Sequence, residues 1–561
     1  MILLLLTAGL IAFAFFASTS EKALRRKLPP GPPGIPILGN LLQLPALRPH
    51  PKLREWAAEY GEIFYLKLGG QDVIVLNSAE AADELLARRS NNYSSRVMPH
   101  VAGSILRGGL GITFLNYDSP WKILRKAMQT SIGPGASKRL HQVQELETLT
   151  MLYDLSCHGD KSVLGETRKN ADVHDLDDHW FAPVRRYATS VTLYAVYGKR
   201  LSHFLNNRDL HRIYDIFGNM VQVSQPGNFL ADVFPIFRQL PDFLTPWRIE
   251  YRKLHESEGC FWQGLVNECK VALQDGEERG GFVNTYLGDR AAAGHGDAPG
   301  GGFTDGWMQD KFLAFGAGTA LEAGSDTTAM GICTFILYML NHPEVLRKAR
   351  EEMDVVVGSD RLPDWDDEPR LPYTVACIKE LLRHRPAAPL GIPHSPLEDD
   401  FYKEYYIPKG CTVIGNIWSI NRDPRRFHNP TAYMPERFYE PGKPTSWGGN
   451  QLAQDREHYA FGWGRRFCAG SHVAQASLFI AISRLVWGVD FSAPLDPATG
   501  RPIVPDLANE EACWTPGWVS TPYPFKVRFA PRSEQHAELI RDSFDAVQAK
   551  WRKMRLDVDE R

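Results

Sequence analysis

One cysteine of this chain, Cys468, lies in a glycine-rich stretch, FGWGRRFCAG, at residues 461–470. The glycines at positions 462, 464 and 470 allow the backbone to turn tightly and to approach another group closely. The residues that follow, AGSHVAQASLFIAISRLVW, have the pattern of a helix. Cys468 should therefore lie at a helix N-terminus, where the helix dipole and free N–H groups favour a thiolate. The plain alternative is a small buried hydrophobe, as a lone cysteine usually is.

The other cysteines, at positions 157, 260, 269, 333, 377, 411 and 513, suggest no competing role for Cys468. They form no C-x-x-C pair and no spacing typical of a zinc site or a disulfide framework. Reduced thiols in a cytosolic compartment are expected. A thiolate supported by glycine N–H groups and an arginine is suited to be the proximal ligand of a haem iron.

The N-terminus predicts a membrane anchor. MILLLLTAGLIAFAFFAS is an uncharged run of 18 residues, just long enough to cross a bilayer as a helix. Lys22, Arg25, Arg26 and Lys27 follow it, and such residues stay on the cytoplasmic side, so the body of the protein should lie in the cytosol. The alternative, a cleaved signal peptide, normally carries positive charge before the apolar run. We expect a single transmembrane anchor at 1–20.

The rest of the chain predicts a mainly α-helical protein with small β-sheets. A basic, proline-rich neck at 21–40 should be semi-rigid and not helical. Alternating residues around Gly69 and Gly70 predict a β-hairpin. Helices are expected at 340–357, at 372–384 and from about 306 to 341, and a flexible surface loop at 291–305. The net charge of −3 gives no indication of a nucleic-acid partner.

The pattern F-x-x-G-x-R-x-C-x-G, which runs from Phe461 to Gly470, resembles the haem-binding signature of the cytochrome P-450 monooxygenases. The resemblance covers the chain from about residue 28 onward. It implies the cytochrome P-450 fold, with one globular haem-thiolate monooxygenase domain at 41–561, where length alone would suggest two or more domains. It also implies that Cys468 is the axial iron ligand of haem b, with Phe461, Gly464 and Arg466 beside the cofactor.

The stretch AGSDTT at 323–328 is poor helix material within the long helix. It indicates either a harmless kink or a local opening that leaves room for a ligand. It resembles the oxygen-activation motif of the family, with Ala323, Gly324, Asp326 and Thr327 as the matching residues. By this match Thr327 would donate a hydrogen bond to dioxygen at the iron, and Asp326, about 100° around the helix, would relay protons from solvent.

Glu380 and Arg383 are three residues apart, which is the spacing of an ordinary surface ion pair on a helix. The resemblance instead implies a buried group that Arg437 completes. A buried glutamate with two arginines is costly unless every member is hydrogen-bonded. The expected role of the three residues is structural, because they would fix the segment that leads to Cys468.

Haem propionates need cationic and N–H donors. Trp121 and Arg125 lie four residues apart and share a helix face, which is also what an ordinary amphipathic edge shows. They resemble the propionate-binding helix of the family, and His394 and Arg466 match further propionate ligands.

Four regions should line the substrate pocket by family position. Their residues are Ile105, Phe114, Phe315, Thr319, Ala320, Ala387, Ala388, Leu390, Trp514, Pro516 and Val519. The set contains no ionisable side chain, and a charged substrate would lose its hydration there without replacement. We therefore expect a neutral, apolar substrate, partly aromatic or polyketide-like. The alternative is that these residues are simply core.

The chain has no G-x-G-x-x-G and no Walker A motif, so its electrons should come from a partner. The resemblance implies a membrane-bound NADPH–cytochrome reductase, with cytochrome b5 as a further donor, O2 as co-substrate, and the endoplasmic reticulum membrane as the location. Five basic residues are candidates for a docking face: Lys122, Lys126, Arg425, Arg426 and Arg465. Scattered basic residues are more often simply solvated.

Three classes of function remain on the sequence alone. An oxygen-inserting monooxygenase leads, because Asp326 and Thr327 are both present. A haem-thiolate enzyme that rearranges or dehydrates its substrate without external electrons is the second, and a non-catalytic haem binder or gas sensor is the third. The C-terminal stretch PFKVRFAPRSEQHAELI and the stretch LEAGSDTT resemble fungal members of the family, which suggests a fungal secondary-metabolite pathway.

Overall fold

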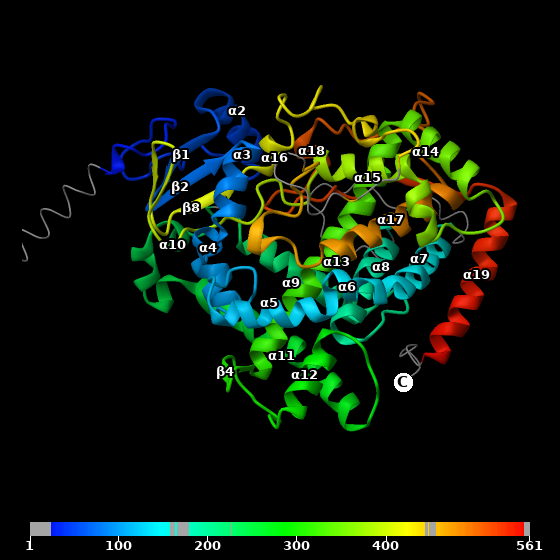
Figure 1. Cartoon of the computed structure of the whole chain (residues 1–561), viewed down its shortest axis with the longest axis horizontal. Coiled ribbons are helices and arrows are strands. Elements are labelled where there is room, and N and C mark those ends of the chain that lie inside the picture. Colours follow the sequence, from blue (N-terminus) through cyan, green and yellow to red (C-terminus); the bar gives the residue numbers. More distant parts are fainter. Residues whose placement is uncertain are drawn as a thin grey trace, which may run out of the picture.

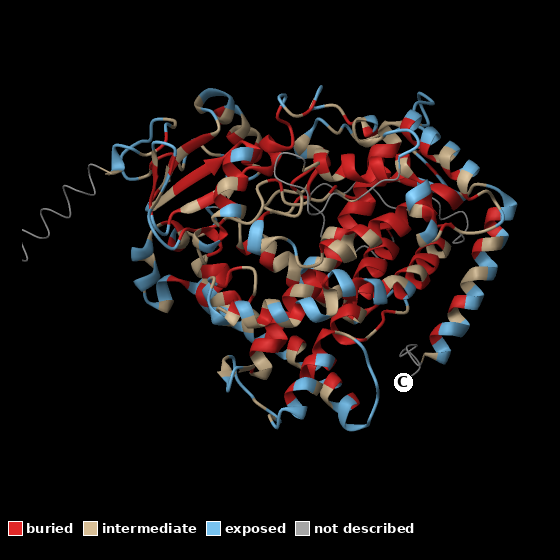
Figure 2. Cartoon of the chain, in the orientation of Figure 1, coloured by how far each residue is buried: buried red, intermediate tan, exposed pale blue. Residues whose placement is uncertain are grey.

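A helix of 32 residues, α13 (Asp310–Asn341), runs through the centre of the computed structural model (Figure 1). It is apolar around most of its circumference, as a helix enclosed by others must be. Helices α8 (Phe181–Tyr197), α11 (Pro246–Gln274) and α17 (Ser471–Gly488) pack against it. Figure 2 shows that the buried residues concentrate in this central layer.

The structure describes residues 24–156, 163–164, 179–225, 227–443, 447 and 456–554. The remaining α-helices of this part are α2 (His50–Tyr60), α3 (Ala79–Ala82), α4 (Ser90–Tyr93), α5 (Ser119–Ile132), α6 (Pro134–Ser137), α7 (His141–Ser156), α9 (Arg208–Val223), α10 (Leu230–Val233), α12 (Phe282–Ala292), α14 (Pro343–Val356), α15 (Pro372–His384), α16 (Ile417–Ile420), α18 (Glu510–Cys513) and α19 (Glu534–Lys553). Shorter turns of π or 3₁₀ helix are η1 (Asp83–Arg88), η2 (His100–Leu106), η3 (Lys138–Leu140), η4 (Pro235–Gln239), η5 (Asp242–Leu244), η6 (Trp365–Arg370), η7 (Pro435–Phe438) and η9 (Gly464–Arg466). The expected helices at 340–357 and 372–384 are confirmed as α14 and α15.

The β-structure is small and peripheral. The predicted hairpin is confirmed as β1 (Ile63–Leu68) and β2 (Gln71–Leu76), and β8 (Thr412–Gly415) adds a parallel strand to β2. The other sheets are β3 (Val163–Leu164), β10 (Val527–Pro531) and β9 (Val489–Ser492) in that order, the pair β4 (Phe303–Thr304) and β5 (Trp307–Met308), and the pair β6 (Asp400–Tyr402) and β7 (Tyr405–Ile407). The mainly α class with small sheets is therefore confirmed.

The proline-rich neck packs along β1 over part of its length. Pro30 O accepts from Tyr65 N at 2.8 Å, and Asn40 N donates to Lys67 O at 2.6 Å. A Cβ on Gly31 would lie 2.0 Å from Tyr65 O, so only glycine fits there. The segment is thus attached to the domain from about Pro30, ahead of the expected boundary at residue 41. The expected anchor at 1–20 lies outside the described residues, and among the described helices none is long and apolar enough to span a bilayer.

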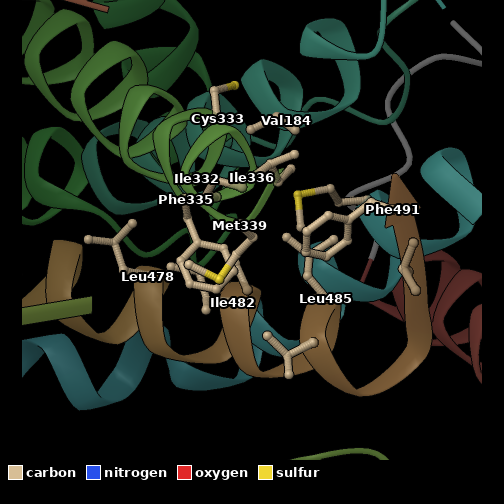
Figure 3. Packing of buried hydrophobic residues seen from close by; sticks show 14 of the residues in the cluster. Val184, Ile332, Cys333, Phe335, Ile336, Met339, Leu478, Ile482, Leu485 and Phe491 are labelled. Carbon is tan, nitrogen blue, oxygen red and sulfur yellow. The ribbon is translucent and has the colours of Figure 1, made fainter. Parts of the chain in front are cut away.

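The contact between α13 and α17 fixes where Cys468 can lie. Figure 3 shows Leu478, Ile482 and Leu485 of α17 against side chains of α13, among them Ile332 and Phe335. All of these residues belong to one buried cluster. Because α17 begins only three residues after Cys468, this packing holds the cysteine at a set position relative to α13.

Candidate active site

The loop before α17 turns on two glycines in the left-handed region, Gly462 (φ 75°) and Gly464 (φ 53°). A Cβ on Gly464 would lie 2.3 Å from Leu86 O of η1, so a larger residue would push the loop away. The Cys468 N–H donates to Phe461 O at 2.9 Å and closes the loop on itself. These glycines therefore allow both the tight turns and the close approach that the sequence predicted. Cys468 lies just ahead of α17.

The Cys468 side chain is exposed, yet it lies deep enough within the protein that burial raises the pKa of its thiol. The Gly470 N–H and the charge of Arg125 lower the pKa, but they do not outweigh burial. The expected influence of the helix start is thus present in the Gly470 N–H, although burial outweighs it. A haem iron bound to Cys468 would supply further stabilisation of the thiolate, because a metal ion deprotonates a bound thiol outright.

One face of α13 is open to the interior. Residues 316, 320, 323, 327 and 331 recur every three or four positions and therefore share this face. Gly316 is covered by Leu124 of α5, because a Cβ there would lie 2.8 Å from Leu124 Cδ1. Gly331 is covered in the same way by Leu478 of α17, at 2.7 Å. Between these two contacts Ala320 and Thr327 are only half-buried and Ala323 is exposed.

Helix α5 connects this open face with the cysteine loop. Its Leu124 contacts α13, while Arg125 Nη2 donates to Phe467 O at 2.7 Å. The Arg466 guanidinium lies 4.4 Å from the centre of the Trp121 ring. Helices α5 and α17 both contact α13 at the ends of its open face, and both adjoin the Cys468 loop. The open face of α13 therefore lies opposite this loop.

Thr327 donates its hydroxyl proton to Ala323 O at 2.7 Å. A hydroxyl has one proton, so the oxygen presents its lone pairs to the open space in this arrangement. Donation toward that space, as expected from the sequence, requires the hydroxyl to rotate. Gly324 is half-buried, and a Cβ there would lie 2.7 Å from Thr192 Cγ2, so this glycine lets α8 approach closely.

Asp326 is buried on the side of α13 that faces α8. Burial raises the pKa of its carboxyl to about 6, and the positive charge of Arg185 opposes the shift. Its Oδ2 has no hydrogen-bond partner among the described residues. A carboxyl with this pKa can both accept and release a proton near neutral pH.

Arg96, Arg125 and Arg466 bring surplus positive charge close to Cys468. Arg466 Nε donates to Ser94 O at 2.7 Å, and its other donors also meet backbone carbonyls. None of the three forms an ion pair within the described part of the chain. Burial lowers the pKa of Arg466 to about 9, and repulsion from Arg125 adds to this shift. Burial lowers the pKa of Arg96 well below its usual value, and repulsion from Arg466 adds to it.

Buried charges are normally paired. The two propionate carboxylates of haem b are the anions that this group of arginines lacks, so the residues present fit the cofactor. Arg96 was not predicted, because the sequence around it matches none of the quoted motifs. It donates to the carbonyls of Ile392 and Pro393, at 2.5 and 2.8 Å.

His394 is buried beside these arginines, and its Nδ1 lies 2.7 Å from Tyr93 O. Burial, followed by the charge of Arg96, lowers its pKa well below the usual value, so the ring is neutral. Nδ1 is then the protonated nitrogen, because it faces a carbonyl, and Nε2 is left as an acceptor. The role of His394 as a propionate ligand stays a prediction.

Glu380, Arg383 and Arg437 form a buried group. Arg383 Nε donates to Glu380 Oε2 at 2.6 Å, and Arg437 Nε donates to Oε1 at 3.0 Å. Met434 N donates to the same carboxylate at 2.9 Å. Arg383 also donates to the carbonyls of residues 421, 430 and 432. The charges are thus hydrogen-bonded, as a buried group requires, and they join α15 to the segment ahead of the cysteine loop.

The expected pocket residues divide into two groups. Half-buried positions, which reach accessible space, are Ile105, Ala320, Ala387, Ala388, Leu390, Pro516 and Val519. Ser520 N donates to Ala387 O at 2.9 Å, which brings two of the four expected regions together. Phe315 and Trp514 have almost no exposed surface and lie in packed clusters, so for them the core alternative holds. Phe114 and Thr319 are also buried, and the Thr319 hydroxyl donates to Phe315 O.

Two neighbours of the pocket were missed. Trp518 stacks on Phe114 at 5.6 Å between ring centres. Arg107 lies beside Thr319, since a Cβ on the intervening Gly111 would be 3.7 Å from Arg107 Cγ and 3.5 Å from Thr319 Oγ1. Arg107, a buried ionisable side chain, therefore lies next to a residue that the sequence assigned to the pocket.

The five basic residues do not form one free face. Lys122 and Arg465 both lie over the Tyr117 ring, and Lys126 is exposed on the same helix as Lys122. Arg425 instead pairs with Asp423 at 2.6 Å. Arg426 is half-buried and donates to Arg456 O.

Proteins similar to this chain are cytochrome P-450 monooxygenases. A family model described as cytochrome P-450 matches residues 29–503. Cytochrome P-450 monooxygenase 69 of Postia placenta is 49% identical over 560 residues, which is 99% of this chain and 98% of the relative. Cytochrome P-450 monooxygenase virE of Hypocrea virens is 35% identical, covering 96% and 92% of the two chains. Cytochrome P-450 monooxygenase fogE of Aspergillus ruber is 34% identical, covering 92% and 90%.

Proposed function

Because the chain belongs to the cytochrome P-450 family and is a monooxygenase, we propose that it inserts one oxygen atom of O2 into a neutral, apolar organic substrate. The observation that carries this proposal is the open face of α13, with Ala323 and Thr327, opposite the Cys468 loop. Haem b, held by Cys468 and by Arg96, Arg125 and Arg466, supplies the activation of O2 when bound.

The residues of the chain hold the protons that this chemistry consumes. Asp326 has a pKa of about 6 and a carboxyl oxygen that no described group occupies, so it can take up a proton and release it again. Thr327, the next residue, presents its hydroxyl to the open face. A rearrangement or dehydration, the alternative, consumes no protons overall, and this favours the monooxygenase.

We assign the substrate to neutral aromatic or polyketide-like compounds of a fungal secondary pathway. The half-buried residues that reach the accessible space are small or aliphatic, such as Ala320, Ala387 and Val519. Phe114 and Trp518 add a stacked aromatic pair beside them. The fungal sources of the similar proteins agree with such a pathway.

A panel of neutral aromatics should shift the haem absorption spectrum of the full-length protein, whereas fatty acids of similar size should not. A carboxylate would lose its hydration among these apolar side chains. The strongest binder should then give a product that carries one atom of oxygen-18 from labelled O2, only when NADPH and a reductase are present. Shifts with the fatty acids alone would contradict the assignment of the substrate, and turnover without NADPH would favour a rearrangement.

We propose that electrons arrive from an NADPH–cytochrome reductase, with cytochrome b5 as a second donor, at a basic patch formed by Lys122, Lys126 and Arg465. Lys122 and Arg465 share the Tyr117 ring, and Arg465 belongs to the cysteine loop itself. Arg425 and Arg426 are left out, because their guanidinium groups are already engaged.

We also propose that the protein resides on the endoplasmic reticulum membrane through residues 1–20. Exposed apolar residues support this location: Ile37 lies in the neck, Leu42 follows it, and Ile236 and Phe243 lie in η4 and η5. The two groups flank the turn between β1 and β2, where Gly70 N donates to Val233 O. An apolar surface of this kind suits contact with lipid.

Deleting residues 1–20 should move much of the protein out of the membrane fraction and leave the haem spectrum unchanged. The neck packs on β1 from about Pro30, so the deletion removes no described contact of the domain. Fractionation by ultracentrifugation, followed by a carbon monoxide difference spectrum of each fraction, measures both effects. Loss of the haem signal on this truncation would mean that the N-terminus is part of the fold.

A further inference from the structure

Arg107 joins three elements that are far apart in the sequence. It follows η2 directly, and its Nη1 lies 3.1 Å from Glu258 Oε2 of α11. Its Nη2 lies 2.7 Å from Glu322 Oε2 of α13. All three side chains are at most 5% exposed. One guanidinium therefore holds the end of η2 against two separate helices, away from water.

The residues on either side of Arg107 strengthen the same junction. Leu106 O lies 2.9 Å from His255 Nδ1 of α11, and the His255 ring stacks on Phe315 of α13. Gly108 has φ 57°, and a Cβ there would lie 2.6 Å from His255 Cε1. The chain thus needs a glycine at position 108 to bring Arg107 to its two carboxylates.

The segment 105–115 leads from this junction to the haem side of the molecule. It carries Ile105 and Phe114, the two residues that the sequence assigns to the substrate pocket, and Phe114 stacks on Trp518. Its far end is fixed as well, because Leu115 O and Ile112 O accept hydrogen bonds from Arg466. Between Arg107 and Arg466 the segment spans the space beside α13.

We propose that Arg107 is a positioning residue, whose bridge between Glu258 and Glu322 fixes the segment 105–115 as one wall of the substrate space. The inference rests on the monooxygenase function proposed above. It concerns how tightly a substrate is enclosed, and Arg107 itself touches neither the haem site nor the cysteine loop in the described structure. In this role Arg107 affects the affinity for the substrate indirectly, by holding the segment 105–115 in place.

The charges of the bridge are unequal. Burial raises the pKa of Glu258 to about 8, and the negative charge of Glu322 adds to this shift. The positive charges of Arg107 and of Arg212 on α9 oppose it. Burial raises the pKa of Glu322 too, but the shorter bond to Arg107 opposes the shift. Because the bond from Arg107 to Glu322 is 2.7 Å and that to Glu258 is 3.1 Å, we take Glu322 as the charged partner of Arg107, and burial favours the protonated form of Glu258. A neutral glutamine at 258 should preserve the bridge, whereas a glutamine at 322 should weaken it.

Hydrogen–deuterium exchange of the full-length holoprotein tests the bridge directly. In Arg107→Met and Glu322→Gln, peptides that cover residues 100–111 should exchange about tenfold faster than in the wild type. Without the bridge this segment opens locally more often, and its amides then exchange. In Glu258→Gln they should exchange at the wild-type rate at neutral pH. Glu256→Gln, on an exposed position of the same helix, is the matched control.

A spectral titration tests the consequence for binding. The probe 4-phenylimidazole places a nitrogen on the iron and an aromatic ring in the space beside α13, whereas imidazole occupies little of that space. Arg107→Met should weaken the binding of 4-phenylimidazole about tenfold and leave imidazole unchanged, since a tenfold change corresponds to about 1.4 kcal/mol. Arg107→Lys should lie between Met and the wild type, because an ammonium cannot span both carboxylates as the guanidinium fork does. A general loss of packing would weaken both probes together.

Unchanged exchange at 100–111 in both Arg107→Met and Glu322→Gln would overturn the proposal. Equal loosening by Glu258→Gln and Glu322→Gln would overturn the assignment of the ion pair to Glu322. If Arg107→Met fails to fold, Arg107→Lys and Glu322→Gln supply the same comparison. A wild-type protein without the absorption of a haem thiolate would contradict the proposed function instead, since the exchange measurement does not depend on the cofactor.

Discussion

Cys468→Ser should abolish the strongly red-shifted Soret band that a thiolate-ligated haem shows in the reduced, carbon-monoxide-bound state. Serine is nearly the same size, and the loop is closed by the backbone bond from Cys468 N to Phe461 O, so the fold should survive. A serine hydroxyl does not become a comparable anionic ligand, and the electron donation that favours O–O cleavage is lost. Monooxygenase activity should fall below detection together with the band.

The structure offers a matched control for this change. Cys260 is also exposed, but it lies on α11 and outside the cysteine loop. Cys260→Ser should keep the red-shifted band and the activity. A Cys468→Ser protein with an unchanged band would remove the assignment of the axial ligand.

Thr327→Ala should continue to oxidise NADPH but release much of the consumed oxygen as hydrogen peroxide. Alanine is a good helix former, so α13 should keep its shape. The hydroxyl beside the open space is lost, and with it the group proposed to hold a proton there, next in sequence to the buried Asp326. We expect product per NADPH to fall by about tenfold or more, which is the scale of a positioned proton donor. Product, NADPH and peroxide measured in one reaction give the coupling.

Thr328→Ala is the control for this change. Thr328 is the next residue on α13, but it is buried and turned away from the open face. Its loss should lower stability slightly and leave the coupling near the wild-type value. Full coupling in Thr327→Ala would refute the role of the hydroxyl.

Much of the fold follows from local patterns in the sequence. The hairpin at Gly69 and the helices α14 and α15 come out as predicted, because each has clear periodicity or turn residues. Helix α13 was expected to begin near Gly306 but begins at Asp310. Gly306 has φ 83° and, with Asp305, forms the two-residue turn between β4 and β5, a local hairpin that lies within the stretch expected to be a loop and the start of the helix.

The site is predictable where a motif fixes the spacing and not elsewhere. Cys468, Thr327 and the Glu380 group lie where the spacing implied. The pocket was harder to predict, because α13 is apolar almost all round and gives no signal of which face is open. Phe315, for example, proves to be core and Ala320 to be accessible. Arg96 and Arg107 act through partners that are hundreds of residues away, so no local pattern marks them.

The two glycines at the ends of the open face of α13 act as spacers. Gly316 lets Leu124 sit directly on the helix, and Gly331 does the same for Leu478. The distance between α13 and the Cys468 loop therefore depends on the absence of a Cβ at Gly316 and Gly331, and not only on the residues that line the space between them. A single methyl at either end would tilt α5 or α17 away from α13 and widen the gap without altering any surface that a substrate meets. A relative can thus accommodate a thicker or thinner molecule through substitutions that no inspection of the pocket wall would reveal.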